Sequence, residues 1–251
     1  MEESASDEPR QRPFSDFVVL QRHMAHLVTF VHYVINNAEP SSLLFYILIE
    51  YYVKGNAKEL QRWAYEVLST FLLPGSPLEI EAVKHTPSLV SHVDDVLDKG
   101  DEGQLRHMFN SVRNRSLDII KSQLIDFQHK KSLGDNAIFG PSQDQLDDIE
   151  KSVERSRETV GHLLGKILDS ITVASPEEPE NRSERQAAIG CVVASLMKLY
   201  GVKSKDPSDG TATVDRWPLF LQKDKNKSAA LFCPFTKSRQ IACMHSLLRF
   251  L

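Results

Sequence analysis

The residues of this chain that come nearest to a chemical site are two histidines, His23 and His26. They stand three positions apart, so a helix would place both imidazoles on one face, as two metal ligands often lie. A zinc site needs at least a third protein ligand, and none stands at a sensible spacing from this pair. We therefore interpret them as a surface or half-buried histidine pair, and we expect no metal and no other cofactor.

The other reactive side chains do not group into a catalytic site either. Two adjacent carboxylate pairs, Asp94-Asp95 and Asp147-Asp148, each point to different sides of a helix, so neither can act as a general acid and base. The chain has no GxxxxGK(S/T) phosphate loop and no GxSxG nucleophile elbow. By elimination, we expect a binding module with no catalytic chemistry of its own.

Two short stretches are candidate contact surfaces. Lys130 and Lys131 end a long amphipathic stretch, where cations either offset the negative end of the helix dipole or form a patch that binds a partner. Ile138 and Phe139 fall in a loop, where apolar side chains either tuck onto the core or contact a partner. The residues alone leave both alternatives open.

The elements that must position these residues are helices. Residues 25–52 hold two strongly apolar stretches around a corner at Pro40, which forbids continuation of the first helix. Ser41 or Ser42 can cap the second helix, 43–53, which has one charged residue and must be buried over most of its circumference. Further helices are expected at 57–72 after an Asn56 cap, 87–97, 102–131, 146–171 and 183–200. No alternation typical of strands appears, so we predict an all-α fold.

Composition limits the class of protein. The 251 residues are 41% hydrophobic and 25% charged, with a formal net charge of −4. No basic stripe with stacking aromatics indicates nucleic-acid binding. No apolar run approaches the ~20 residues that span a bilayer, and the polar N-terminus is unlike an export signal. We expect a cytoplasmic protein whose cysteines are reduced, and Cys233 and Cys243 lack the paired spacing of a zinc site.

Three separated segments resemble one family. The stretch AHLVTFVHYVINNAEPSSLLFYILIEYY, residues 25–52, resembles the opening of the RGS-like, or RGS-homology, domain of Rho guanine-nucleotide exchange factors. QLIDFQHKKSLG, residues 123–134, is similar to the family's Gln-Leu/Ile-x-Asp-aromatic stretch with its basic residues and Leu/Met-Gly. DRWPLFLQKDKNKS, residues 215–228, looks like the basic tail of the PDZ-containing members. The PDZ-RhoGEF and leukaemia-associated RhoGEF branch looks nearest.

The resemblance implies an RGS-like helical bundle with a packed C-terminal helical extension, which we place at residues 14–202. The charged, proline-punctuated residues 1–13 are expected to form a disordered acidic arm, and residues 203–251 a basic, largely disordered tail. Residues 229–251 resemble nothing in the family. No exchange (Dbl-homology) domain is recognisable in the sequence, so we expect that the 251 residues do not themselves carry nucleotide exchange on Rho.

The resemblance also implies a partner, the GTP-bound α subunit of a heterotrimeric G protein of the twelve/thirteen class. Such a module would link that subunit to Rho signalling and would be recruited through it from the cytoplasm to the plasma membrane. Carried over by position, the Gα-binding residues end the long helix and enter the next loop. They are Phe127, Lys130, Lys131, Leu133, Gly134, Ile138 and Phe139.

Acceleration of GTP hydrolysis is a separate matter in this family, because some members owe it to an acidic segment ahead of the domain that ends in an aromatic residue. The counterparts here are Glu2, Glu3, Asp7, Glu8 and Phe14. Between Glu8 and Phe14 the chain has prolines and arginines where the family has acidic residues. We therefore expect binding to the α subunit with weak or no acceleration of GTP hydrolysis. A GTPase-accelerating protein for the same subunits and a helical adaptor without G-protein binding are the alternatives.

Overall fold

The computed structural model describes residues 12–84, 86–99, 101–133, 140–172 and 180–202, and among them every regular element is helical. The all-α prediction is therefore confirmed. Two short elements come first, η1 (Pro13–Ser15) and α1 (Phe17–Leu20). The others are α2 (Met24–Asn37), α3 (Ser41–Tyr52), α4 (Ala57–Val67), η2 (Leu68–Leu72), α5 (Glu81–Lys84), α6 (Pro87–Lys99), α7 (Glu102–His107), α8 (Asn110–Ser132), α10 (Gln143–Glu150), α11 (Val153–Thr172) and α12 (Glu180–Leu199).

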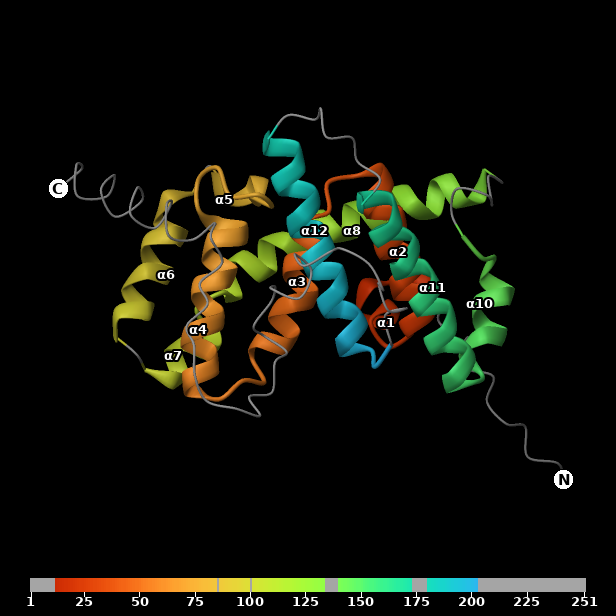
Figure 1. Ribbon diagram of the computed structural model, residues 1–251, viewed down its shortest axis with the longest axis horizontal. Helices are drawn as coiled ribbons and strands as arrows, with labels where there is room; N and C mark the ends of the chain where they lie inside the picture. Colours follow the sequence, from red (N-terminus) through yellow and green to blue (C-terminus); the bar gives the residue numbers. More distant parts are fainter. Residues whose placement is uncertain (1–11, 85, 100, 134–139, 173–179, 203–251) are drawn as a thin grey trace, which may run out of the picture.

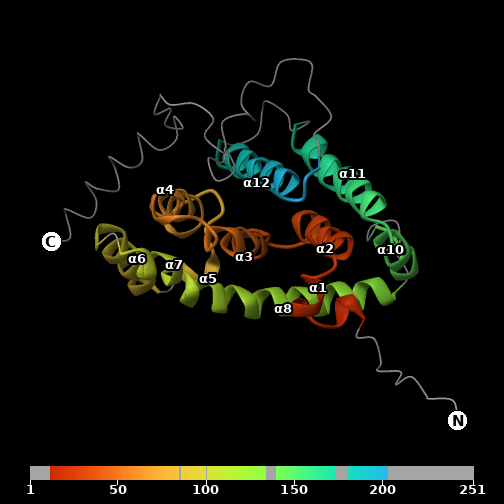
Figure 2. The same cartoon turned by 90° about the horizontal axis from the view of Figure 1, so that it is seen from below.

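The helices form three layers, which Figure 2 shows side-on. The middle layer is α2 and α3, α8 runs along one side of it, and α11 and α12 lie on the other. The helices α4, α6 and α7 gather at the end of α3 that lies away from α2 (Figure 1). The middle layer is thus covered on both sides.

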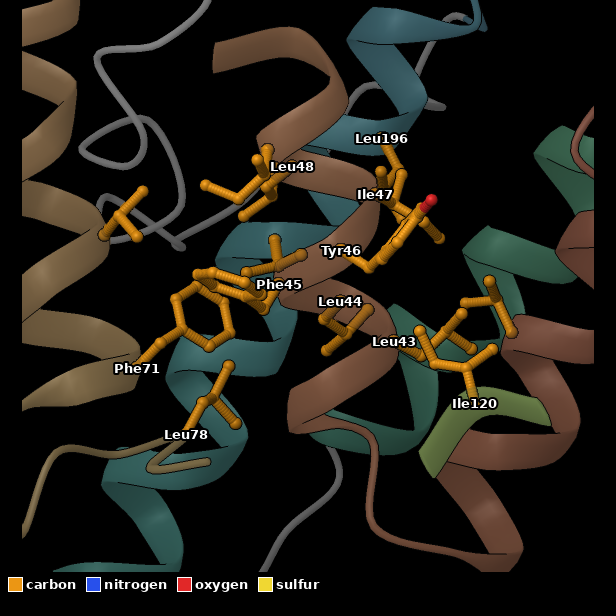
Figure 3. Packing of buried hydrophobic residues seen from close by; sticks show 14 of the residues in the cluster. Leu43, Leu44, Phe45, Tyr46, Ile47, Leu48, Phe71, Leu78, Ile120 and Leu196 are labelled. Carbon is orange, nitrogen blue, oxygen red and sulfur yellow. The ribbon is translucent and has the colours of Figure 1, made fainter. Parts of the chain in front are cut away.

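Helix α3 is buried nearly all round, as its apolar sequence predicts. Every residue from Leu43 to Ile49 is at most 5% exposed. In Figure 3 its side chains point to neighbours on several sides, among them Phe71 of η2 and Leu196 of α12. Aromatic contacts add to this packing, with the rings of Phe45 and Phe71 meeting edge to face at 5.6 Å.

Two helix starts show how local sequence sets the element boundaries. The Asn56 side chain accepts a hydrogen bond from the Glu59 amide at 3.1 Å, and the Glu59 carboxylate accepts one from the Asn56 amide at 2.9 Å. This capping box confirms the predicted start at residue 57. The start of α3 differs from our expectation, because neither serine caps it with its side chain. Glu39 takes that role, accepting bonds from the Ser41 amide at 3.2 Å and the Ser41 hydroxyl at 2.6 Å.

The predicted helix 102–131 is in fact two helices, α7 and α8, separated at Met108 and Phe109. The hydroxyl of Tyr52 donates a hydrogen bond of 2.7 Å to the carbonyl of Leu105. In an unbroken helix that carbonyl would accept from the amide of Phe109. Both residues of the break are buried, so the corner turns two more apolar side chains into the core.

The predicted helix 146–171 is likewise divided, into α10 and α11, by a turn at Lys151 and Ser152. The last helix, α12, ends at Leu199, and Gly201 follows with a φ of +65°, the left-handed geometry expected of a glycine that stops a helix. None of the described helices is long and apolar enough to cross a membrane.

Candidate functional site

Phe127 lies in the core rather than at the surface. Its side chain is 0% exposed, and its ring packs 4.9 Å from that of Tyr33 and 5.1 Å from that of Phe14. A ring in this position cannot touch a partner while α8 is folded. The carried-over contact role of Phe127 is therefore corrected to a supporting one.

Lys130 stands on the surface one turn beyond Phe127. Its Nζ lies 2.9 Å from Asp126 Oδ2 and 5.8 Å from the centre of the Tyr33 ring. The Tyr33 hydroxyl donates to the same carboxylate oxygen at 2.7 Å. The hydrogen bond to Asp126 raises the pKa of Lys130 above its ordinary value, so the side chain stays cationic. This is an exposed positive charge fixed in place by its neighbours.

Lys131 has a different environment from that of Lys130. Its ammonium lies 4.6 Å from the centre of the Phe14 ring and 5.4 Å from that of Phe127, and it donates to the Pro141 carbonyl at 3.1 Å. Burial lowers its pKa from the ordinary value. Lys131 thus packs over the buried rings of Phe14 and Phe127 through cation–π contacts, and its hydrogen bond to Pro141 joins α8 to the segment before α10.

The end of α8 also exposes an apolar side chain, since Leu133 is 73% exposed. Single exposed apolar residues are common on protein surfaces, so Leu133 is a candidate contact only through the family resemblance and its place beyond Lys130. Gly134, Ile138 and Phe139 lie outside the described residues, and so do Glu2, Glu3, Asp7 and Glu8 of the acidic arm.

Phe14, the aromatic residue assigned to that arm, is 4% exposed and packs on Phe127 and on His26, each at 5.1 Å between ring centres. Pro13 before it is buried too, and the described residues include two that we had placed in the arm, Arg12 and Pro13. Phe14 is a core residue here. An aromatic side chain used in this way is not available to reach along a partner's surface.

The histidine pair acquires a third potential ligand that the sequence did not indicate. Glu150, at the end of α10, places Oε2 at 2.6 Å from His23 Nδ1 and Oε1 at 3.1 Å from His26 Nδ1. Asp147, one turn earlier, lies 3.1 Å from His26 Nε2. Burial raises the pKa of Glu150, but the close contacts of His26 and His23 outweigh it and hold that pKa below its ordinary value.

Only a faint signal of this cluster exists in the sequence. Asp147 and Glu150 are three apart, as His23 and His26 are, so each pair shares one helix face. No local sequence pattern indicates that the two helix faces meet, because more than 120 residues separate the two pairs along the chain. The adjacent pair Asp147-Asp148 does diverge as predicted, since Asp148 turns away to contact Lys151 and Arg155.

Comparison with known families decides what kind of domain this is. The family model of the regulator of G protein signalling-like domain matches residues 10–203. The chain belongs to this family. The RGS-like match spans the whole described part, from η1 to the end of α12, so the C-terminal helices are part of the domain.

Curated relatives of this RGS-like chain are much longer proteins. It is 24% identical over 223 residues to human Rho guanine nucleotide exchange factor 11, a match covering 86% of this chain and 14% of that protein. It is 26% identical over 207 residues to human Rho guanine nucleotide exchange factor 12, covering 77% of this chain and 12% of that protein. The chain thus spans about a seventh of the length of these relatives.

Solved RGS-like structures share the fold. The RGS-like domain of PDZ-RhoGEF matches with a TM-score of 0.64 at 23% identity, over 76% of this chain and 97% of that one. The same domain of PDZ-RhoGEF in a complex with Gα13 bound to GTPγS gives 0.64 at 22% identity, over 80% of this chain and 100% of that one. The predicted bundle with a packed C-terminal extension is confirmed.

Proposed function

We propose that this chain is a regulatory module that binds the GTP-bound α subunit of a heterotrimeric G protein of the twelve/thirteen class. The observation that carries the proposal is the RGS-like match over residues 10–203 together with the shared fold of a PDZ-RhoGEF domain in complex with Gα13 bound to GTPγS. The module acts by binding and performs no chemistry of its own. Through the G protein it is recruited from the cytoplasm to the plasma membrane, where it connects the subunit to Rho signalling.

The C-terminal end of α8 is the surface that we assign to this partner. Lys130 offers an exposed ammonium held by Asp126, and Leu133 offers an apolar side chain that is 73% exposed. Interfaces combine such an apolar anchor with charges that steer the encounter and select the partner. Gly134, Ile138 and Phe139 are assigned to the same partner by the family resemblance alone, while Phe127 and Lys131 support the end of α8 from the core side.

The test uses the purified chain and the α subunit in three nucleotide states: GDP, GTPγS, and GDP with aluminium fluoride. Recognition of the active subunit predicts capture of the GTPγS form and little capture of the GDP form. Capture of the aluminium fluoride form alone would favour a GTPase-accelerating protein instead. Absence of capture in every state would refute the proposal and favour a helical adaptor that does not bind G proteins.

A charge reversal locates the surface. Lys130→Glu is expected to weaken binding at least about fivefold, which corresponds to about 1 kcal/mol. The matched control is Lys121→Glu on the same helix, because nine residues at 100° each place Lys121 on the opposite side of α8. Equal affinity of the Lys130 variant and the wild type, with the fold intact in circular dichroism, would refute the assignment of this surface.

Strong GTPase acceleration is not part of the proposal, and the packing of Phe14 is the reason. Its ring is held between Phe127, His26 and the Lys131 ammonium, inside the domain. Single-turnover GTP hydrolysis by the α subunit is therefore expected to change little when the chain is added. A large increase in that rate would show that another segment supplies the acceleration.

A further inference from the structure

The cluster of His23, His26 and Glu150 brings together three metal-binding side chains. One ligand atom from each lies within 4.8 Å of the others. At Zn–N and Zn–O distances of about 2.0–2.1 Å, tetrahedral ligand atoms stand about 3.3 Å apart. The present contacts use different carboxylate oxygens, 3.1 Å from His26 Nδ1 to Oε1 and 2.6 Å from His23 Nδ1 to Oε2. A side-chain shift is therefore needed to bring Oε2 to this spacing from both imidazoles.

His26 is the member that most needs a partner. Its side chain is 0% exposed, and neither ring nitrogen makes a hydrogen bond of acceptable geometry, although a carboxylate oxygen lies 3.1 Å from each. A buried polar ring without a well-directed bond is costly, whereas a metal at Nδ1 would use its lone pair fully. Nε2–H would then face Asp147, the carboxylate–histidine–metal arrangement that fixes a ligand's tautomer and orientation.

Glu150 is already held in position by the start of α2. Its Oε1 accepts the backbone amides of Ala25 at 2.9 Å and His26 at 3.3 Å, so it serves α2 as a remote cap. That role occupies one oxygen and leaves Oε2 directed at His23. The His23 side chain is 37% exposed, which provides an entry path and room for a water as the fourth ligand.

We propose that His23, His26 and Glu150 form a zinc site, with Asp147 orienting the His26 ring from behind. Two imidazoles and one carboxylate with an open fourth position are an established zinc ligand set. The ion would tie the start of α2 to the end of α10 and so fasten the first helices of the domain to its C-terminal extension. The site is independent of G-protein recognition, and either proposal can fail without the other.

The experiment is a calorimetric titration of the metal-stripped full chain with Zn²⁺, repeated with His23→Ala and Asp147→Asn. We expect one site in the wild type and affinity at least about tenfold weaker in each variant. Both changed side chains are partly exposed, and the Glu150 bonds to α2 persist, so both variants should fold. His92→Ala, which alters an exposed histidine on α6, is the matched control and should bind like the wild type.

Stability and spectroscopy give two further readouts. Zinc at about 100 times its dissociation constant should raise the wild-type melting temperature by about 5–10 °C, and Mg²⁺ should not. Co²⁺ in the site should show weak d–d bands without a thiolate charge-transfer band, because no cysteine is a ligand. Absence of zinc binding, equal affinity in His23→Ala, or a thiolate band would each overturn the proposal.

Discussion

At the scale of single residues, Phe127 fastens the last turns of α8 to the start of the chain. Its ring meets those of Phe14, Phe30 and Tyr33 at centroid distances of 5.1, 5.6 and 4.9 Å. Such a cluster gains both from apolar burial and from the edge-to-face geometry of the rings. Helical periodicity places Phe127 on the buried side of its helix, and the structure agrees with this pattern rather than with the contact role carried over from the family.

We therefore expect Phe127→Ala to act first on stability. Removing a fully buried phenylalanine side chain leaves a cavity and should lower the free energy of unfolding by about 3–5 kcal/mol, measured by urea denaturation. Ile125→Ala, on the exposed side of the same helix, is the control and should change it by less than about 0.5 kcal/mol. Wild-type stability combined with lost Gα binding would instead mean that the ring itself reaches the partner.

At the scale of elements, the corner between α2 and α3 joins three parts of the domain through Glu39. Its carboxylate caps α3 at Ser41, and Arg185 of α12 places one guanidinium nitrogen 2.6 Å from each carboxylate oxygen. Gln123 of α8 donates to the Glu39 backbone carbonyl at 2.8 Å. One corner residue thus links the middle layer to both outer layers.

This corner predicts a pH-dependent contribution to stability. Burial raises the pKa of Glu39, but the hydrogen bonds from Arg185 and Ser41 outweigh it, so the pKa lies below its ordinary 4.5 in the folded state. A lowered folded-state pKa means that the stabilisation is complete above about pH 4.5 and is lost as pH falls through the folded-state value. Arg185→Ala should therefore destabilise the domain at neutral pH, by up to about 1 kcal/mol because the pair is partly exposed.

The measurement is urea denaturation of wild type and Arg185→Ala at pH 7 and at about pH 3. The difference between them should shrink at the lower pH. Arg157→Ala, an exposed arginine of α11, should show no such pH-dependent difference. A difference that stays constant with pH would show that Arg185 acts through packing and not through Glu39.

At the scale of the whole molecule, α11 and α12 complete the core. They bury Val160, Leu163, Leu164 and Ile167 from one helix and Val192, Val193 and Leu196 from the other. Helix α11 packs on α2 and α12 packs on α11, and both helices lie on the side of α2 and α3 that is opposite α8. The C-terminal extension is therefore a structural half of the domain, and the middle layer cannot be buried without it.

A chain that ends at residue 133 should consequently fail to fold. Its α2 and α3 would expose an apolar face whose burial contributes on the order of 10 kcal/mol, as much as the entire stability of a typical domain. Circular dichroism and thermal melting should show reduced helicity and no cooperative transition, whereas residues 12–202 should melt cooperatively. A folded, cooperative chain 12–133 would show that the first helices form an independent bundle.

Much of the fold follows from local sequence. The spacing of apolar residues determines the helices and their buried faces, and Asn56 with Glu59 specifies a helix start, because these interactions join residues at most four positions apart. The position of Lys130 at the end of a helix marks it as a candidate contact from the sequence, whereas Leu133 is a candidate only through the family resemblance. Their role in binding stays a prediction.

What only the tertiary structure decided depends on contacts between distant residues. The Tyr52 hydroxyl bonds to a carbonyl next to the break in a predicted helix, and Arg185 reaches Glu39. Glu150 joins a histidine pair that the sequence left without a third ligand. Periodicity and capping report which face of a helix is apolar and where the helix begins. They carry no information about which other helix that face meets, since this is settled by how the layers pack around α2 and α3.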